Sequence, residues 1–481
     1  MPQVNWGNLG SCKVEREGEM PSANKRQGET MQRPAKKRFL ILALVLLVTA
    51  WACERASEER PDPPEKFPPA LIAHLNSSTQ PLSGADPELP DGELAPLADL
   101  GQARIVGLGE ATHGTHEFFA MKHRLFRWLV ERFDFRTFAF ECDYGESIYL
   151  DRWLNHGEGD LDDLMRNTMH FWTWRTVEVK ALFEWMRRVN LERPETERLH
   201  FVGVDCQYAT YQPALLREYL ERVSPQRRAG IEPLLAREES FRDSRFSNLS
   251  WEEYQSLQQD LEAEWRAWQD LKEEFTRQSS PREFETARQL LRSLSQVNQF
   301  VFERNATVNY RDLFMADNAL WAQEHYGAGR GIAFWAHNLH VANDSSDNWA
   351  DATGYHLRQQ LGRQYVAVGF SFCRGTFSAW GYDPVSQTYT GLQVHTIDVP
   401  PLAYSVNDLF FVADKKAFFV RLDRLVPGEP LHVWFNQGRK MLNIGAAYDG
   451  DPHGHYLFPF SVPLHYDVLV HFDRSTFAAQ I

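Results

Sequence analysis

A carboxylate and an imidazole lie three residues apart in one turn of the sequence. Glu110 and His113 belong to the segment Gly109-Glu-Ala-Thr-His-Gly, which follows a short apolar run and precedes a helical pattern. Histidine beside a carboxylate suits general acid–base chemistry near neutral pH, because the carboxylate fixes the tautomer of the imidazole and raises its basicity. This turn is therefore a candidate for the catalytic centre of an enzyme.

Three further short apolar runs end in side chains of the same kind: Glu141, Asp205 and His337, with His340 three residues beyond. Any one of these alone is better explained as a helix cap or a satisfied core residue. The carboxyl ends of parallel strands, however, meet at one edge of a sheet, and open α/β sheets bind ligands there. Four such ends together predict one shared cleft.

The elements that would position these residues are six apolar runs that have the character of short strands. They cover residues 104–109, 136–141, 199–205, 331–337, 365–370 and 466–472. Helical segments separate them; after Thr115, for example, apolar residues recur at helical spacing from 118 to 129. Strands that alternate with helices predict an α/β fold with a mostly parallel central sheet and helices on both faces.

A long helical insertion is expected between the third and fourth strands, over residues of about 213–330. Ser250-Trp-Glu-Glu253 fits a helix capping box, and helical spacing continues through 257–275 and again through 284–310. The insertion is either a cap over the strand ends or a helical pair packed on the side of the domain. The sequence supports both interpretations equally.

The N-terminal region reads as a targeting segment. Residues 1–30 are polar and without pattern, which predicts disorder or a non-native extension. A basic run after Met31 leads into the apolar stretch 39–48, which is too short to span a bilayer, where about 20 apolar residues are needed. With Ala50-Trp-Ala52 behind it, this pattern predicts a signal peptide over residues 31–53.

Cys53 stands where a bacterial lipoprotein carries its lipid, so membrane attachment through Cys53 is one expectation and a plain signal cut after Ala52 is the alternative. In either case we expect export, to the cell envelope or the periplasm. The charged, proline-rich residues 54–69 predict a linker, and the folded domain is expected over residues 70–481.

Charge and cysteine content exclude several classes of function. A net charge of −14 disfavours nucleic acid as a partner. The five cysteines contain no CxxC pair, so a structural zinc site is not expected. Cys142, Cys206 and Cys373 remain in the mature domain, so at most one disulfide bridge can form among them.

Three familiar catalytic motifs are incomplete. Gly107-x-Gly109 lacks the third small residue of a dinucleotide loop, and the run from Gly369 to Cys373 has a cysteine where a nucleophile elbow requires glycine. His116-Glu117 lacks the second histidine of a zinc-protease helix. Cys142 should point into the core, because side chains alternate along a strand. Catalysis by activated water is therefore the simplest expectation.

With these residues in place, the chain resembles the erythromycin esterase family from about residue 95 to its C-terminus. The segments that carry the resemblance are Gly109-Glu-Ala-Thr-His113-Gly, Met121-Lys-His-Arg-Leu, Phe135-Arg-Thr-Phe-Ala-Phe-Glu141, Phe171-Trp-Thr-Trp, Gly203-Val-Asp205-Cys-Gln207, Arg311-Asp-x-x-Met-Ala-x-Asn318, Trp335-Ala-His-Asn-x-His340 and Tyr466-Asp-Val-Leu-Val. The resemblance implies hydrolysis of the ester in a macrolide lactone ring by water, without an acyl-enzyme.

The resemblance also implies roles for single residues. His113 would be the general base, and Glu110 and Glu141 would orient it and hold the water. His337 and His340 would face the carbonyl oxygen, where a donor must stabilise the developing oxyanion. His116 and His123 receive no role and are expected at the surface or behind the catalytic residues.

Substrate binding is expected from a second set: Lys122, Trp172, Trp174, Asp205 and Asn338. Lys122 occupies a position where some macrolide-degrading members have arginine, and a lysine cannot make the same bidentate contact. The two tryptophans either line an apolar pocket or belong to the core, as expected for Phe171. The substrate is expected to be a small-molecule ester or a macrolide.

Two alternatives from other classes remain open. Glu110, His113, Glu141, His337 and His340 would also suit zinc or manganese, which would make the chain a metal-dependent hydrolase. The expected state is nevertheless without a cofactor, since the sequence contains no compact ligand motif. A non-catalytic exported protein could instead use the same cleft to hold a ligand.

Overall fold

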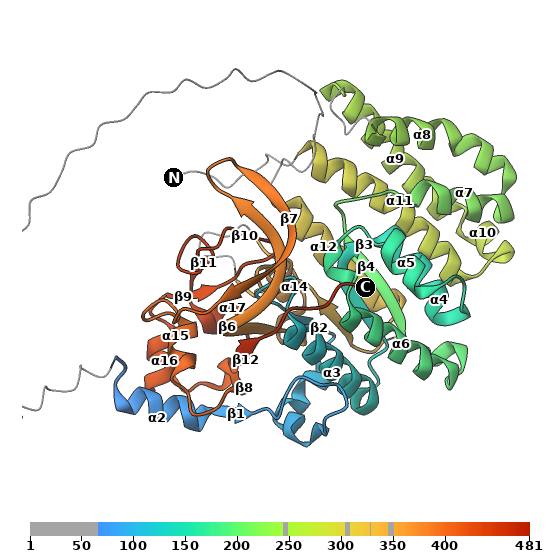
Figure 1. The fold of residues 1–481 in the computed structure, drawn as a ribbon. Coiled ribbons are helices and arrows are strands. Elements are labelled where there is room, and N and C mark those ends of the chain that lie inside the picture. Colours follow the sequence, from blue (N-terminus) through green and yellow to red (C-terminus); the bar gives the residue numbers. More distant parts are fainter. Residues whose placement is uncertain (1–65, 244–248, 304–307, 328, 345–350) are drawn as a thin grey trace, which may run out of the picture. The chain divides into compact units, whose positions relative to one another are not determined.

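The computed structural model describes residues 66–481, apart from 244–248, 304–307, 328 and 345–350 (Figure 1). The expected signal peptide, Cys53 and most of the expected linker lie outside the described residues. The first described helix, α2 (Pro69–Ser78), begins one residue before the expected start of the folded domain. Among the helices of the described residues, none combines the length and the apolar character that a membrane crossing requires.

All six expected strands are present in one ten-stranded sheet. They are β2 (Ile105–Leu108), β3 (Thr137–Asp143), β4 (His200–Asp205), β5 (Ile332–Trp335), β6 (Tyr365–Asp383) and β12 (Val468–Ser475). They pair in parallel in the order β12-β6-β2-β5-β3-β4. The prediction of a parallel central sheet is therefore confirmed for these six strands.

Other strands make the sheet partly antiparallel. β8 (Ala417–Arg421) pairs antiparallel with β12, and β1 (Thr79–Pro81) extends that edge. β6 continues beyond the expected end at 370 and forms a long antiparallel ribbon with β7 (Thr388–Ile397), which projects from the sheet in Figure 1. β10 (Ala447–Tyr448) also pairs with β6, and β9 (Arg439–Leu442) pairs with β11 (Leu457–Phe460) in a second small sheet.

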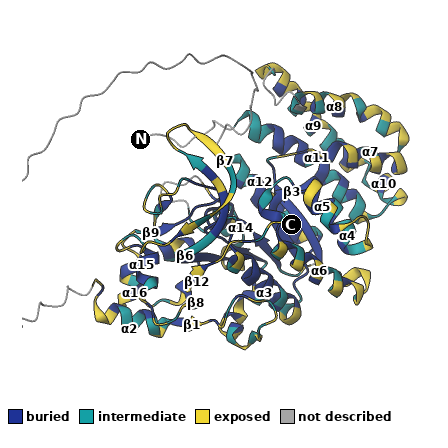
Figure 2. Cartoon of the chain, in the orientation of Figure 1, coloured by how far each residue is buried: buried dark blue, intermediate teal, exposed yellow. Residues whose placement is uncertain are grey.

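Helices cover both faces of the sheet, as predicted. Consecutive strand residues point to opposite faces, and because both sets are apolar, each face needs a layer of helices to bury it. Ile105 belongs to one hydrophobic cluster and Val106 to the other. The cluster around Val106 is completed by η1 (Asp91–Gln102), α3 (His116–Phe133), α5 (Leu161–Asn167) and α6 (Val177–Leu191). Figure 2 shows the resulting dark, buried centre between lighter outer helix faces.

The expected helical insertion lies between β4 and β5. It contains α7 (Gln212–Val223), α8 (Pro225–Asp243), α9 (Trp251–Asp270), α10 (Lys272–Gln278), α11 (Pro281–Phe302) and α12 (Tyr310–His325). The predicted capping box at Ser250 is present. The second long helical pattern, predicted over 284–310, corresponds to α11, which ends at Phe302, and α12 begins at Tyr310. In α12, Asn318 donates to the carbonyl of Val204 in β4 (2.9 Å) and fixes this helix against the sheet.

The remaining elements are short or peripheral to the site. They are α4 (Tyr144–His156), η2 (Trp172–Trp174), η3 (Glu195–Glu197), α13 (Asn338–Val341), α14 (Thr353–Leu361), η4 (Gly362–Gln364), α15 (Val406–Phe411), η5 (Leu422–Arg424), α16 (Pro430–Phe435) and α17 (Val462–His465). Cys142, Cys206 and Cys373 are buried and free, and Cys142 points into the core as predicted.

Candidate active site

The strand order places the predicted strand ends side by side. β5 lies between β2 and β3, so His337, just past β5, has Glu110 and His113 on one side and Glu141 on the other. Asp205 ends the neighbouring strand β4. One edge of the parallel sheet therefore brings these five residues together.

The first group at this edge is the pair in the turn after β2. His113 Nδ1 lies 2.6 Å from Glu110 Oε1, and the side chain of His113 keeps 14% of its surface exposed while that of Glu110 is fully buried. The other oxygen of Glu110 accepts from Lys122 Nζ (2.5 Å) and Trp335 Nε1 (2.7 Å). When the ring carries a single proton, Glu110 thus holds that proton on Nδ1, and Nε2 is left as a base.

Lys122 is enclosed beneath this pair. It is fully buried in α3, and its ammonium lies 4.2 Å from the ring centroid of Trp335. Burial lowers the pKa of Lys122 to about 8, although the charge of Glu110 opposes that shift. Lys122, which is predicted to bind substrate, neutralises and orients in the structure the carboxylate that holds His113.

Arg311 is the second cation of the site and was not predicted as a site residue. It comes from the first turn of α12, and its Nε and Nη2 atoms bind both oxygens of Asp205 (2.9 and 2.8 Å). Nη2 also donates to Glu141 Oε1 (2.6 Å). Asp205 is predicted to contact substrate, and in the structure it holds Arg311. The segment Arg311-Asp312 carried part of the family resemblance, which was the available signal.

Glu141 is held in its charged form. Burial alone would raise the pKa of Glu141, but His340, Arg311 and His113 outweigh burial and hold the pKa well below its usual range. Its second oxygen accepts the backbone N–H of His337 (2.9 Å). Glu141 thus ties β3 to His337, the second residue after β5.

His340 has partners on both ring nitrogens. Nδ1 lies 2.7 Å from Asp312 Oδ1, and Nε2 lies 3.0 Å from Arg311 Nη1 and 3.4 Å from Glu141 Oε1. Burial would lower the pKa of His340, but the carboxylates of Asp312 and Glu141 raise it. An unprotonated Nε2 accepts from Arg311, and a protonated Nε2 faces Glu141. In both states His340 is engaged by the protein.

His337 differs, because one of its nitrogens has no partner. Its Nδ1 accepts the N–H of Leu339 (3.2 Å) as the cap of α13, which places the proton of a neutral ring on Nε2. Burial, followed by the nearby His113 and His340, lowers the pKa of His337 well below its usual value. Among the described residues, the buried Nε2 has no hydrogen-bond partner. His337 is thus a neutral donor.

The other residues expected to bind substrate have different surroundings. Asn338 is fully buried and bonds to the backbone of Phe370 and to Asn443. Trp174 is buried against Phe140 and Trp335, so it belongs to the core. Trp172 and Phe171 are half-buried.

The two histidines of α3 to which no role was assigned, His116 and His123, differ in their exposure to solvent. His116 is half-exposed and lies 2.7 Å from Glu178. His123 is buried against Trp185, so of the two expected positions, at the surface or behind the catalytic residues, the surface position is wrong for this residue. The apolar face of α3 faces the core at this turn and takes His123 with it.

The carboxylates and imidazoles at this edge are a poor fit to a divalent metal. In the part of the chain that the structure describes, no group of three or more His, Cys, Asp or Glu side chains is placed to hold an ion. Both oxygens of Glu110 and both of Asp205 already accept from protein donors, and two cations lie among them. The oxygens that a divalent ion would need are therefore already engaged by protein donors.

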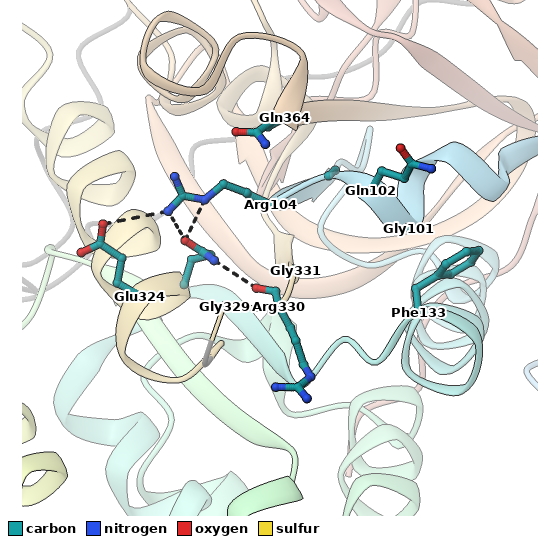
Figure 3. Close-up of a pocket in the computed structure, with 11 residues that line it drawn as sticks. Gly101, Gln102, Arg104, Phe133, Glu324, Gly329, Arg330, Gly331 and Gln364 are labelled. Carbon is teal, nitrogen blue, oxygen red and sulfur yellow. Dashed lines mark hydrogen bonds and ion pairs between the residues drawn. The ribbon is translucent and has the colours of Figure 1, made fainter.

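A pocket of about 660 Å³ lies at the amino ends of the parallel strands, opposite the ends that carry His113 and His337 (Figure 3). Its lining includes Arg104, Gly331 and Gln364, which immediately precede β2, β5 and β6. Arg104 points into it beside Glu324, with a closest approach of 3.9 Å. A four-residue strand spans about 13 Å, so this pocket is separate from the edge that holds His113.

Comparison with known proteins places this chain in a family. The family model "Erythromycin esterase" matches residues 130–475, which include Glu141, Arg311 and His337. Erythromycin esterase type II of Escherichia coli is 37% identical over 106 residues, 22% of this chain and 24% of the relative. The putative hydrolase YbfO of Bacillus subtilis is 22% identical over 66% of this chain and 74% of its own length. The chain thus spans about a quarter of the Escherichia coli relative that it matches.

Solved structures share the fold. A Bacillus cereus protein superimposes with a TM-score of 0.73 at 22% identity over 85% of this chain and 98% of its own. A histidine-to-asparagine variant of erythromycin esterase EreC, in its open conformation, gives a TM-score of 0.59 at 18% identity over 81% of this chain and 95% of its own. The fold and the family match agree, and family membership supports a hydrolase. The chain belongs to the erythromycin esterase family.

Proposed function

We propose that this protein is an esterase in which His113 activates water to cleave a carboxylic ester, with a macrolide lactone as the leading substrate class. One observation carries the proposal: a base and a neutral donor face one region. The rings of His113 and His337 lie 5.2 Å apart between centroids, and the Nε2 of His337 has no partner among the described residues. Ester hydrolysis needs a base for water and a donor for the oxyanion.

The reaction begins when Nε2 of His113 accepts a proton from water as the water oxygen bonds to the acyl carbon. The electron pair of the carbonyl double bond moves to oxygen, and the Nε2–H of His337 donates to that oxyanion. Glu110 stabilises the imidazolium that forms on His113, because it accepts from Nδ1 at 2.6 Å. The oxyanion then restores the carbonyl bond, the bond to the alkoxy group breaks, and the imidazolium returns its proton to the leaving oxygen.

The remaining polar residues position this machinery. Glu141 accepts the backbone N–H of His337 and thereby fixes the ring of the oxyanion donor. Arg311 and His340 hold Glu141 from the other side. The expectation that His340 also faces the carbonyl oxygen is replaced in this proposal by a positioning role, since both of its nitrogens have protein partners.

The substrate class is supported by the relatives rather than by the site. Two Escherichia coli proteins that match this chain are named erythromycin esterases, and both matches span about a quarter of those proteins. Opening of a macrolide ring would place the protein in antibiotic resistance. The same site could cleave a simpler ester, since acyl transfer to water needs the same base and donor.

The test is turnover of a panel by the purified protein: erythromycin, p-nitrophenyl acetate and p-nitrophenyl butyrate, each with and without 1,10-phenanthroline. We expect hydrolysis of at least one ester, with the added mass of one water for an opened lactone, and the same rate after chelation. Loss of turnover on chelation that zinc restores would replace the proposal by a metal-dependent hydrolase. No turnover of any ester, with retained macrolide binding, would make the protein a binding protein.

A further inference from the structure

The segment around Gly445 is hydrogen-bonded to the turn that carries Glu110 and His113. Ile444 and Gly445 donate their N–H groups to the carbonyl of Ala111 (2.7 and 3.4 Å), and the N–H of His113 donates to the carbonyl of Gly445 (3.2 Å). Thr112 and Gly445 form a parallel bridge. The backbone of Gly445 is therefore fixed against the segment that carries the proposed base.

Gly445 also borders both proposed catalytic imidazoles. A methyl group on its Cα would lie 3.8 Å from Nε2 of His337 and 4.0 Å from Cδ2 of His113. It would meet no other atom of the described residues within 4 Å, apart from its chain neighbours. The absent side chain thus leaves space that only the two rings border closely.

Both chemical steps require that space. An oxyanion that accepts a hydrogen bond from Nε2 of His337 must lie about 2.9 Å from that nitrogen. The attacking water must reach Nε2 of His113, which is bonded to the same Cδ2 atom that the methyl group would contact. A methyl group at 3.8 Å from one ring and 4.0 Å from the other competes with both.

We infer that Gly445 is a specificity-determining residue: because it has no side chain, it keeps open the subsite for the acyl carbon and admits larger acyl substituents. The inference rests on the proposed esterase function. Gly445 has φ +74°, so a side chain there also strains the backbone, and that effect must be separated from the steric one. Gly438 is the matched control, because it has φ +64°, is exposed and has nothing within 4 Å of an added Cβ.

The experiment compares Gly445→Ala with Gly438→Ala on p-nitrophenyl acetate and p-nitrophenyl pivalate. We expect Gly445→Ala to lower kcat/KM on the acetate by about tenfold, the usual effect of one methyl group in a pocket, and to lower it further on the bulkier pivalate. Gly438→Ala should stay within about twofold, as surface substitutions do. Equal rates for the two variants on both esters would overturn the inference.

A second readout does not depend on turnover. Diethyl pyrocarbonate modifies accessible imidazoles, and peptide mass spectrometry follows His113 with His116 as the internal reference. We expect slower modification of His113 in Gly445→Ala than in Gly438→Ala. If the wild type hydrolyses no ester, the esterase proposal fails, and the modification rate alone decides whether Gly445 keeps this space open. A rate equal to that of the control overturns it.

A second pair of variants, Gly445→Asn and Gly438→Asn, keeps the test decisive if Gly445→Ala does not fold. Asparagine adopts left-handed backbone more readily than alanine does, so Gly445→Asn relieves part of the strain while adding a larger side chain. If Gly445→Ala does not fold, Gly445→Asn is compared with Gly438→Asn in both assays. Wild-type rates in Gly445→Asn would contradict the inference.

Discussion

The imidazole rings of His113 and His337 lie with their centroids 5.2 Å apart and their planes tilted by 53°. They belong to segments that follow two adjacent parallel strands, β2 and β5, and they are prepared differently. Glu110 holds the proton of His113 on Nδ1, whereas the N–H of Leu339 leaves the proton of His337 on Nε2. One ring thus offers a lone pair and the other a proton to the same region.

Replacement of His337 should separate donation from binding. His337→Leu removes the donor, and we expect kcat to fall by about 10²- to 10³-fold with little change in KM, as when an oxyanion donor is lost elsewhere. His337→Gln should retain more activity than His337→Leu, because its amide can donate near the position of Nε2. Steady-state kinetics on one ester measures both parameters. Equal kcat values for the two variants would contradict the donor role.

The ion pair of Lys122 with Glu110 should show strong coupling. Lys122→Met leaves a buried carboxylate without its cation, and we expect the free energy of unfolding to fall by about 3–5 kcal/mol. In the Glu110→Gln background the same substitution should cost much less, because the amide carries no charge. Urea unfolding of the two single variants and the double variant closes the cycle. Additive costs would show that the two groups do not act together.

The sequence predicted the residues at the strand ends because parallel strands share an edge, so Glu110, Glu141, Asp205 and His337 needed no knowledge of strand order. Their order was not predictable. β5 inserts between β2 and β3, and this pairing joins segments almost 200 residues apart. The contribution of Arg311 depends likewise on α12 folding back onto β4.

The burial of Lys122 was not predicted, although the sequence carries a signal for it. Phe118, four residues before Lys122, is on the buried face of α3, so a lysine at this position faces the core as well. A charge on an apolar helix face predicts a buried ion pair, and the acidic partner was the same Glu110 that the sequence had already identified. Gly445 had no comparable signal, because its place beside the histidines arises from a long-range backbone contact.

Arg311 should act by position rather than by charge alone. Arg311→Lys keeps the charge but loses the two parallel hydrogen bonds to Asp205. We expect kcat to fall about tenfold or more, because Glu141 and His337 are then misplaced. Arg217→Lys is the matched control, since Arg217 also binds two carboxylates, Glu232 and Glu239. We expect wild-type kcat in the control. An equal loss in both variants would indicate a general loss of stability.

Buried histidines should make the protein less stable in mild acid. Burial lowers the pKa of His123 to about 3, so the unfolded chain takes up a proton below its ordinary pKa of 6.5 that the folded chain does not. The stability from His123 is complete above pH 6.5 and is lost as the pH falls. At pH 5 the difference of about 1.5 pH units corresponds to about 2 kcal/mol.

His123→Phe should remove this part of the pH dependence. The free energy of unfolding in urea, measured at pH 7 and pH 5, should fall by about 2 kcal/mol less in the variant than in the wild type. His116→Phe serves as the control, because the pKa of His116 is raised by Glu178 and its effect has the opposite sign. An unchanged pH dependence in His123→Phe would contradict the assignment of a neutral, buried imidazole.

The central claim is that His113 takes the proton from water. The direct measurement is kcat/KM of His113→Ala against His116→Ala on an ester that the wild type hydrolyses, with both variants shown to be folded by their thermal unfolding. We predict a loss of about 10²- to 10⁴-fold for His113→Ala, the usual contribution of a general base, and wild-type activity for the exposed His116→Ala. A folded His113→Ala variant with wild-type turnover would contradict the account.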